Sequence, residues 1–319
     1  APPPLGTPLR HQRLGAHLLP EPWIPMRMEE VSPSFGLPAL LALAVSVVGP
    51  ADLSSQEDWK TDFTRVAVDP AEIVSGGPPK DGIPAIDEPK FTSIGGANRY
   101  LGKNEPVAVV RWNGETKVYP IQILIFHEIV NDEIGGRPVS VTYCPLCNTT
   151  LAFDRRFEDE VLDFGTTGRL RHSDMIMYDR QTETWWQQAT GEGIVGQHAG
   201  ARLTPVPAPV MRWEDVKSQL PDARVLSRDT GYPGYLRRYG TNPYRGYDRQ
   251  DGPFDWAFSG RRNKALPQME RVVALYEEGV AWAVPFSELE KVGVAHLTVG
   301  CLWHINLHPT GLRLDGHHD

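Results

Sequence analysis

Short runs of alternating apolar and polar residues fill the middle of the chain, and turn residues separate them. The first clear case is Pro106–Trp112, a predicted strand that an Asn-Gly turn joins to a returning strand at Glu115–Tyr119. Pro120 ends this hairpin, and the apolar segment 121–130 after it predicts a short helix. Val139–Tyr143 is rich in β-branched residues and predicts a buried strand.

The same alternation continues after this strand, with turn signals at short and regular spacing. Residues 148–153, 160–164, 173–178 and 184–188 each predict a strand, which is the pattern of a β-meander. The 30 Gly and 29 Pro of the chain also favour a turn-rich protein over a helical bundle. The sequence therefore predicts a mostly β fold of the β-rich α+β class, with meander and hairpin sheets and a few short helices.

The hairpin pattern occurs twice along the chain. Five positions match at a constant offset of 165 residues (270 − 105), without a gap: Glu105 and Glu270, Val107 and Val272, Gly114 and Gly279, Pro120 and Pro285, and Leu124 and Leu289. Both copies read as strand, glycine turn, strand, proline and short helix, so we expect a duplicated β-module. The second copy continues only to about Val299 before a His-rich end, so we expect it to be incomplete.

Composition along the chain divides it into four parts. Residues 1–51 read as a disordered extension plus a secretory signal at about 26–51, because the apolar segment Phe35–Val48 is followed by small residues. A short buried helix is the alternative for this segment. Residues 52–80 predict a linker, 81–295 a β-rich domain and 296–319 an atypical His-rich tail. The signal predicts a periplasmic or extracellular protein.

The bulk numbers exclude several classes of function. A net charge of -8 gives no electrostatic support to a nucleic-acid groove. The chain has no run of 18 apolar residues, so we expect no ordinary membrane-spanning helix. Three cysteines are too few for a disulfide scaffold.

Five segments of the chain carry a resemblance to a known family: Ile83–Asp87, His127–Asp132, Thr142–Cys147, Met177–Thr182 and Ser227–Tyr232. Together they resemble the prokaryotic domain-of-unknown-function family 3179, which contains a Cys-Pro-Leu-Cys motif. The likeness covers about residues 81–289. The resemblance implies a β-rich domain, frequent in exported or lipid-anchored proteins, and it implies no established activity.

The candidate chemistry depends most on Cys144 and Cys147. Two thiolates at this spacing can hold one soft or borderline ion, and imidazoles can complete the ligand set. The first hypothesis is a zinc or copper site made by Cys144, Cys147, His127 and His172, with Glu128 as the partner that orients His127.

Two other interpretations of the cysteine pair stay open. A thiol–disulfide oxidoreductase would use both thiols, but the residues after Cys147 predict a strand, where a helix N-terminus would lower a thiol pKa. The pair could also be structural, buried or disulfide-bonded at a tight turn. The nearby carboxylates, including Asp174 and Asp179, are mostly expected to form turns, because Asp hydrogen-bonds its own backbone there.

A third kind of candidate is aromatic. Neighbouring strand positions point to opposite faces, so we expect one of Trp185 and Trp186 in the core and the other on the opposite face. A Trp exposed beside Arg171 could stack a sugar or a peptide, although packing in a two-layer sheet explains both. The long aromatic stretch that begins at Tyr232 predicts a flap or a disordered excursion. A non-catalytic binding module presenting Tyr232–Tyr247 is therefore the third hypothesis.

Overall fold

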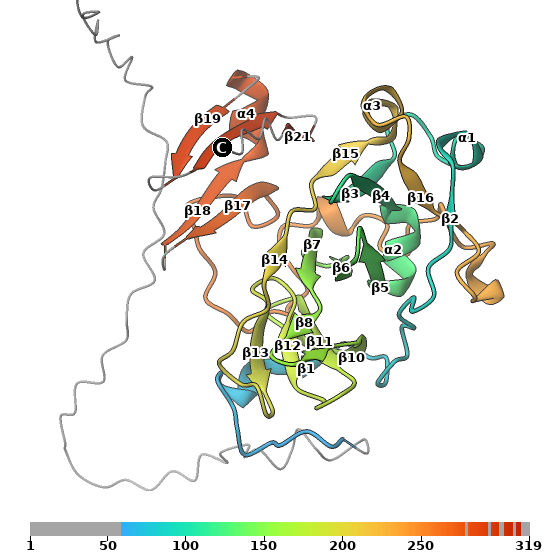
Figure 1. The fold of residues 1–319 in the computed structure, drawn as a ribbon. Coiled ribbons are helices and arrows are strands. Elements are labelled where there is room, and N and C mark those ends of the chain that lie inside the picture. Colours follow the sequence, from blue (N-terminus) through green and yellow to red (C-terminus); the bar gives the residue numbers. More distant parts are fainter. Residues whose placement is uncertain (1–58, 278–279, 293–294, 300–302, 309–310, 314–319) are drawn as a thin grey trace, which may run out of the picture.

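The computed structural model describes residues 59–277, 280–292, 295–299, 303–308 and 311–313 (Figure 1). The predicted signal at 26–51 and the first residues of the predicted linker lie outside these ranges, so export stays a prediction. The described chain consists mainly of antiparallel strands with a few short helices, which confirms the predicted β-rich class. None of the described helices is long and apolar enough to cross a membrane.

The elements follow one another in short steps. The strands are β1 (Ile73–Ser75), β2 (Phe91–Thr92), β3 (Pro106–Trp112), β4 (Glu115–Pro120), β5 (Ile129–Ile134), β6 (Arg137–Cys144), β7 (Thr149–Asp154), β8 (Arg156–Phe157), β9 (Glu160–Val161), β10 (Phe164–Arg171), β11 (Asp174–Asp179), β12 (Trp185–Gln187), β13 (Glu192–Val195), β14 (Pro205–Val206), β15 (Val210–Arg212), β16 (Arg224–Leu226), β17 (Val272–Glu277), β18 (Val280–Pro285), β19 (Ala295–Val299), β20 (Trp303–His308) and β21 (Gly311–Arg313). The α-helices are α1 (Ile94–Ala97), α2 (Ile121–His127), α3 (Trp213–Gln219) and α4 (Phe286–Val292), and the 3-10 helices are η2 (Pro70–Glu72), η3 (Pro233–Tyr235) and η4 (Tyr247–Arg249).

Two sheets position the cysteine pair. One has the strand order β14-β7-β6-β5, and the other has the order β1-β10-β11-β12-β13. Apolar side chains from both sheets form a shared core, which includes Phe153 of β7, Met177 of β11, Trp186 of β12 and Cys144 itself. The end of β6 and the start of β11 therefore meet at this core, where Cys144 and Met175 pack in the same cluster.

Asn131 on β5 fastens the two sheets to each other. Its side-chain Nδ2 donates to the carbonyl of Phe164 at 2.8 Å and to Oδ1 of Asp87 at 2.8 Å. Its Oδ1 accepts from the N–H of Phe164 at 3.1 Å. Because Phe164 opens β10, a fully buried amide on one sheet satisfies both backbone groups of a residue on the other.

The duplication predicted from the sequence is confirmed by the register of the strands. Val107 pairs with Pro120 in the first hairpin, and Val272 pairs with Pro285 in the second, again 165 residues later (272 − 107). Helices α2 and α4 follow at the same offset, and each leads into an antiparallel meander, β5-β6-β7 or β19-β20-β21. Strands β20 and β21 lie within residues 296–319, which the sequence analysis set apart as a tail.

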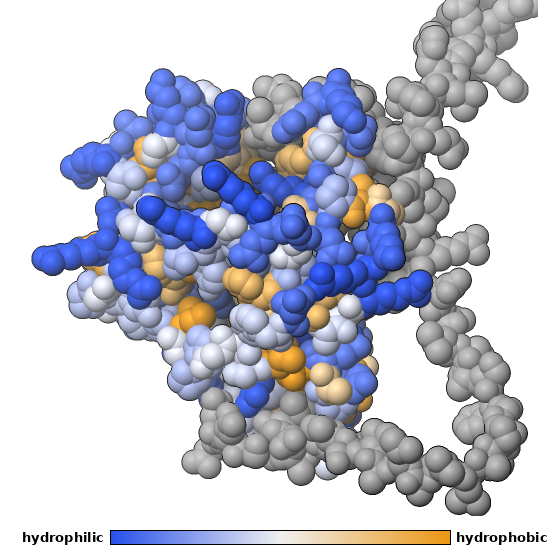
Figure 2. Space-filling view, turned by 180° about the vertical axis from the view of Figure 1, so that it is seen from behind, coloured by the Kyte–Doolittle hydropathy of each residue, from blue (hydrophilic) through white to orange (hydrophobic). Residues whose placement is uncertain are grey.

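Trp185 and Trp186 are both fully buried, on opposite faces of β12. Trp186 lies in the core shared by the two sheets, and Trp185 lies in a second cluster with Tyr178 and Trp59. The two residues occupy opposite faces as predicted, neither is exposed, and packing in the two cores, which the sequence also allowed, explains both. The face that Figure 2 shows is mostly hydrophilic, with small apolar areas.

Candidate metal centre

Cys144 and Cys147 lie in the turn between β6 and β7. Cys144 is the last residue of β6 and pairs with Thr149, the first of β7, so the turn spans residues 145–148. Asn148 supplies the left-handed conformation that the turn needs, with φ of 49°, and its Oδ1 accepts from the Tyr143 hydroxyl at 3.1 Å. A strand follows the pair, as predicted, so no helix N-terminus lies here to lower a thiol pKa.

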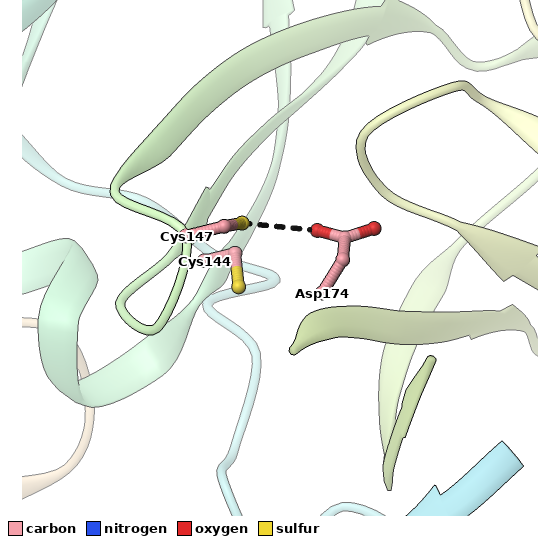
Figure 3. A group of neighbouring side chains, drawn as sticks. All are labelled: Cys144, Cys147 and Asp174. Carbon is pink, nitrogen blue, oxygen red and sulfur yellow. Dashed lines mark hydrogen bonds between the residues drawn. The ribbon is translucent and has the colours of Figure 1, made fainter. Parts of the chain in front are cut away.

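Asp174 brings a third ligand atom to the two thiols from the other sheet. It is the first residue of β11, directly after a two-residue turn made by His172 and Ser173. The sulfurs of Cys144 and Cys147 and a carboxylate oxygen of Asp174 all lie within 4.8 Å of one another. Figure 3 shows the Cys147 sulfur pointing at Oδ1 of Asp174, at a distance of 3.2 Å. From the sequence, most carboxylates of this region were expected to form turns, whereas Asp174 begins a strand and faces the thiols.

The group is buried, and burial shifts its proton affinities. Asp174 is 4% exposed, and burial raises its pKa to about 6, although its second oxygen accepts from the N–H of Ala189 at 2.9 Å. The hydrogen bond with Cys144 raises the pKa of Cys147 well above the ordinary value, and burial raises it further. Without a cation, Cys147 is therefore a protonated thiol at neutral pH that donates to Asp174.

Glu128 adds a second buried carboxyl near the group. It ends α2 in a left-handed conformation with φ of 58°, and its main-chain oxygen accepts from the N–H of Tyr143, the neighbour of Cys144, at 2.8 Å. Burial raises the pKa of Glu128 to about 8, and the charge of Asp174 contributes to the shift. The metal hypothesis gave Glu128 the role of orienting His127. In the structure, its carboxyl is close enough to Asp174 for that charge to raise its pKa.

His127 and His172 lie outside the group of ligand atoms. His127 Nδ1 is 2.8 Å from the carbonyl oxygen of Pro84, and Nε2 is 2.6 Å from the hydroxyl of Tyr239. Because a carbonyl only accepts, Nδ1 carries the proton in the neutral ring, and Nε2 accepts from Tyr239. His172 Nε2 lies 3.5 Å from the carboxylate of Glu72. Both imidazoles therefore have other partners, and Asp174 occupies the place that the metal hypothesis gave to a histidine.

The residues predicted to bind a sugar or a peptide are engaged inside the fold. Arg171 donates to Glu72 at 2.8 Å and to Gln187 at 2.7 Å, and the hydroxyl of Tyr232 donates to the carbonyl of Ala85 at 3.0 Å. Both Trp side chains of β12 are also buried, so no exposed aromatic ring of β12 is available to stack a sugar or a peptide.

Two thiols and a carboxylate at the junction of two sheets form a ligand set that suits a borderline metal ion. Thiolate and carboxylate are both established zinc ligands, and three protein ligands leave one coordination position open. A hard cation such as Mg²⁺ prefers oxygen ligands alone and is a poor match for two sulfurs. No sequence signal separated Asp174 from the other turn carboxylates, because only the pairing of β10 with β11 brings it to Cys147.

Comparison with known proteins gives a family and no activity. A family model described as "Protein of unknown function (DUF3179)" matches residues 80–306. No curated protein matches the chain, and neither does any solved structure. The match spans well over half of the 319 residues and includes every residue of the candidate metal centre. It confirms the resemblance seen in the sequence, and the chain belongs to the DUF3179 family.

Proposed function

We propose that the protein binds a zinc ion through Cys144, Cys147 and Asp174. The observation that carries the proposal is the convergence of two sulfurs and a carboxylate oxygen within 4.8 Å in a buried place. A buried carboxyl with a raised pKa is costly to ionise, and a bound divalent cation removes that cost by compensating its charge. Metal binding would release the thiol protons. The bound ion would then join the end of one sheet to the end of the other.

The ligand chemistry favours zinc over copper. Copper(I) selects thiolate and thioether ligands, whereas the third atom here is a carboxylate oxygen. Met175 and Met177, which carry thioethers on the same strand as Asp174, pack in the apolar core shared by the two sheets. Zinc accepts sulfur and oxygen in one tetrahedral set, and a water or substrate atom would take the fourth position.

No cysteine stands at the position that matches Cys144 in the second copy of the duplicated module. At the offset of 165 residues, His127 corresponds to Val292, Glu128 to Gly293 and Cys144 to Pro309. A shared folding role would require similar residues in both copies. The difference supports a role of the first copy's residues in binding rather than in holding the module together.

Metal analysis of the protein tests this proposal. Protein purified without chelator and analysed by mass spectrometry of its elements should contain about one zinc per chain, as one site predicts. Cys144→Ser and Asp174→Asn should lose the metal, and Cys301→Ser is the matched control because it removes the third cysteine. A wild-type protein without stoichiometric metal, together with unchanged stability in Cys144→Ser, would disprove the proposal.

A thiol–disulfide oxidoreductase is the second candidate, and one contact favours it. Asp174 accepts a hydrogen bond from the Cys147 thiol, so it could take that proton while the sulfur attacks a disulfide substrate. Cys144 and Cys147 would then form a disulfide, and the substrate would be reduced to two thiols. A measurable dithiol potential with no bound metal would favour this function over zinc binding.

Export is a further part of the proposal. The apolar segment Phe35–Val48 with small residues after it supports a secretory signal. Alkaline phosphatase fused after residue 58 folds only in an oxidising compartment, so it should be active in a bacterial host. Activity equal to that of a fusion lacking residues 26–51 would reject export.

A further inference from the structure

Residues 229–260 form a long segment that lies against the body of the protein next to the candidate zinc centre. We name it the aromatic cover. It contains only the short helices η3 and η4 and no strand, and most of its residues are exposed. Its tyrosines are the exception, because Tyr239 and Tyr247 are 5% and 6% exposed. These two tyrosine side chains therefore face the body, whereas Trp256 of the cover is 54% exposed.

A chain of hydrogen bonds fastens the first part of the cover. The Tyr239 hydroxyl lies 2.6 Å from His127 Nε2 and 2.7 Å from the Thr230 hydroxyl. Since His127 donates to Pro84 through Nδ1, the chain has one direction in the neutral state: Thr230 donates to Tyr239, which donates to His127. His127 is the last residue of α2 and precedes Glu128, so this fastening lies close to the buried carboxyl.

A second fastening joins the cover to the hairpin that carries Asp174. The carbonyl of Ala257 accepts from the N–H of Ser173 at 2.7 Å and from its hydroxyl at 3.3 Å. The cover also approaches the tip of this hairpin closely, because a Cβ added at Gly260 would lie 2.9 Å from His172 Nδ1. The carbonyl of Ser173 in turn faces the Cys144 sulfur at 3.6 Å. The same residue thus contacts both the cover and a candidate ligand.

Two tyrosines of the cover lie between these fastenings and near the centre itself. Burial raises the pKa of Tyr244 to about 12, and the charges of Glu128 and Cys144 add to the shift. Burial likewise raises the pKa of Tyr247, with contributions from the charges of both cysteines. The charges of the centre thus act on both phenols, and the Ser173–Ala257 bonds hold this part of the cover beside the hairpin that carries Asp174.

The cover should open more easily than the sheets beneath it. Its backbone makes turn hydrogen bonds and no ladder with another strand, and much of its surface is exposed. Segments of this kind open locally at a free energy well below that of global unfolding. The Tyr239 chain and the Ser173–Ala257 bonds are the polar contacts nearest the centre that such an opening breaks, and the Tyr232–Ala85 and Lys90–Asp229 contacts lie at the far end of the cover.

We propose that the aromatic cover controls how fast the ion enters and leaves the Cys144–Cys147–Asp174 centre, with Tyr239 and Ser173 as its two fastening points. This inference rests on the proposed zinc function and describes the regulation of that same site. The ion reaches the sulfurs when the cover opens, and a closed cover holds it against competing chelators.

Release of zinc to a chromogenic chelator tests the cover. Zinc-loaded protein is mixed with excess 4-(2-pyridylazo)resorcinol, and the coloured complex is followed with time. Tyr239→Phe keeps the ring and removes the hydroxyl, so release should be about three- to tenfold faster, the effect of losing one hydrogen bond. Ser173→Ala, at the other fastening point, should act in the same direction. Tyr100→Phe is the matched control, since it removes a single bond to the Leu226 carbonyl outside the cover.

Thiol modification of the metal-free protein separates failure of the cover from failure of the zinc proposal. Iodoacetamide should modify the cysteine pair faster in Tyr239→Phe and Ser173→Ala than in the wild type or Tyr100→Phe. Zinc binding with wild-type release and modification rates in both variants would overturn the cover. If the wild type binds no zinc but the two variants are modified faster, the zinc proposal is rejected. The cover would then control access to the thiols and not to an ion.

Discussion

The sulfur of Cys147 and the carboxylate of Asp174 are in contact across two sheets, 3.2 Å apart, although 27 residues separate them in the chain. The contact joins the turn after β6 to the first residue of β11. Around it lie the Cys144 thiol and the buried carboxyl of Glu128, so four acidic groups gather at one end of a shared core.

Asp174→Asn should weaken zinc binding by at least about 10-fold, because mutation of residues that only hydrogen-bond to a metal ligand already costs about that much. The amide keeps the size of the side chain and loses the charge that compensates the cation. Competition with a calibrated zinc chelator measures the affinity. Asp215→Asn, in α3, removes a partly exposed carboxylate that pairs with Arg212 and should leave the affinity unchanged. Equal affinities of the two variants would rule Asp174 out as a ligand.

Glu128→Gln should flatten the pH dependence of stability in the metal-free protein. The folded pKa of Glu128 is raised to about 8 from 4.5, so the folded state binds more protons than the unfolded state between these values. The free energy of unfolding of the wild type should therefore fall as the pH rises from about 5 to 8. The fall should be a few kcal/mol at most, because one pH unit contributes about 1.36 kcal/mol. Urea unfolding at both pH values measures it, with the exposed Glu88→Gln as control. A wild-type protein equally stable at both values would contradict the shift.

Asn131→Ala should destabilise the fold by roughly 2–4 kcal/mol, because it leaves both buried backbone groups of Phe164 without their partners. The junction that brings Asp174 to the cysteines should loosen as well. Chemical denaturation gives the free energy of unfolding, and Asn242→Ala, on the exposed surface, is the control. A change below about 0.5 kcal/mol, the range of surface substitutions, would show that Asn131 does not hold the sheets together.

Cys147 should react slowly with iodoacetamide at pH 7.5 in the folded, reduced and metal-free protein. Its pKa is raised by the hydrogen bond with Cys144 and by burial, and the thiolate is the reactive form. Unfolding in urea should restore the ordinary rate, and zinc should protect the folded protein completely. Peptide mapping by mass spectrometry identifies the modified cysteine. Fast modification of Cys147 would favour the thiol–disulfide function over the metal centre.

The sequence alone determined the secondary structure class, the turn around the cysteine pair and the duplication of the module. These features depend on neighbours along the chain: alternation sets strand faces, Gly, Asn and Pro set turns, and a repeat at one offset needs no contact to be seen. For this reason the hairpins at Pro106–Pro120 and Val272–Pro285 were predictable down to their pairing.

Only the tertiary structure decided which side chains meet the cysteines. Asp174 reaches Cys147 because β10 and β11 pair and pack across the core from β6. Tyr239, 112 residues further along the chain, hydrogen-bonds to His127, which was expected to bind a metal. Trp185 and Trp186 are both buried because each face of β12 has its own core. A sequence pattern specifies which face a residue occupies, whereas its partner on that face comes from strands and loops that the pattern does not order in space.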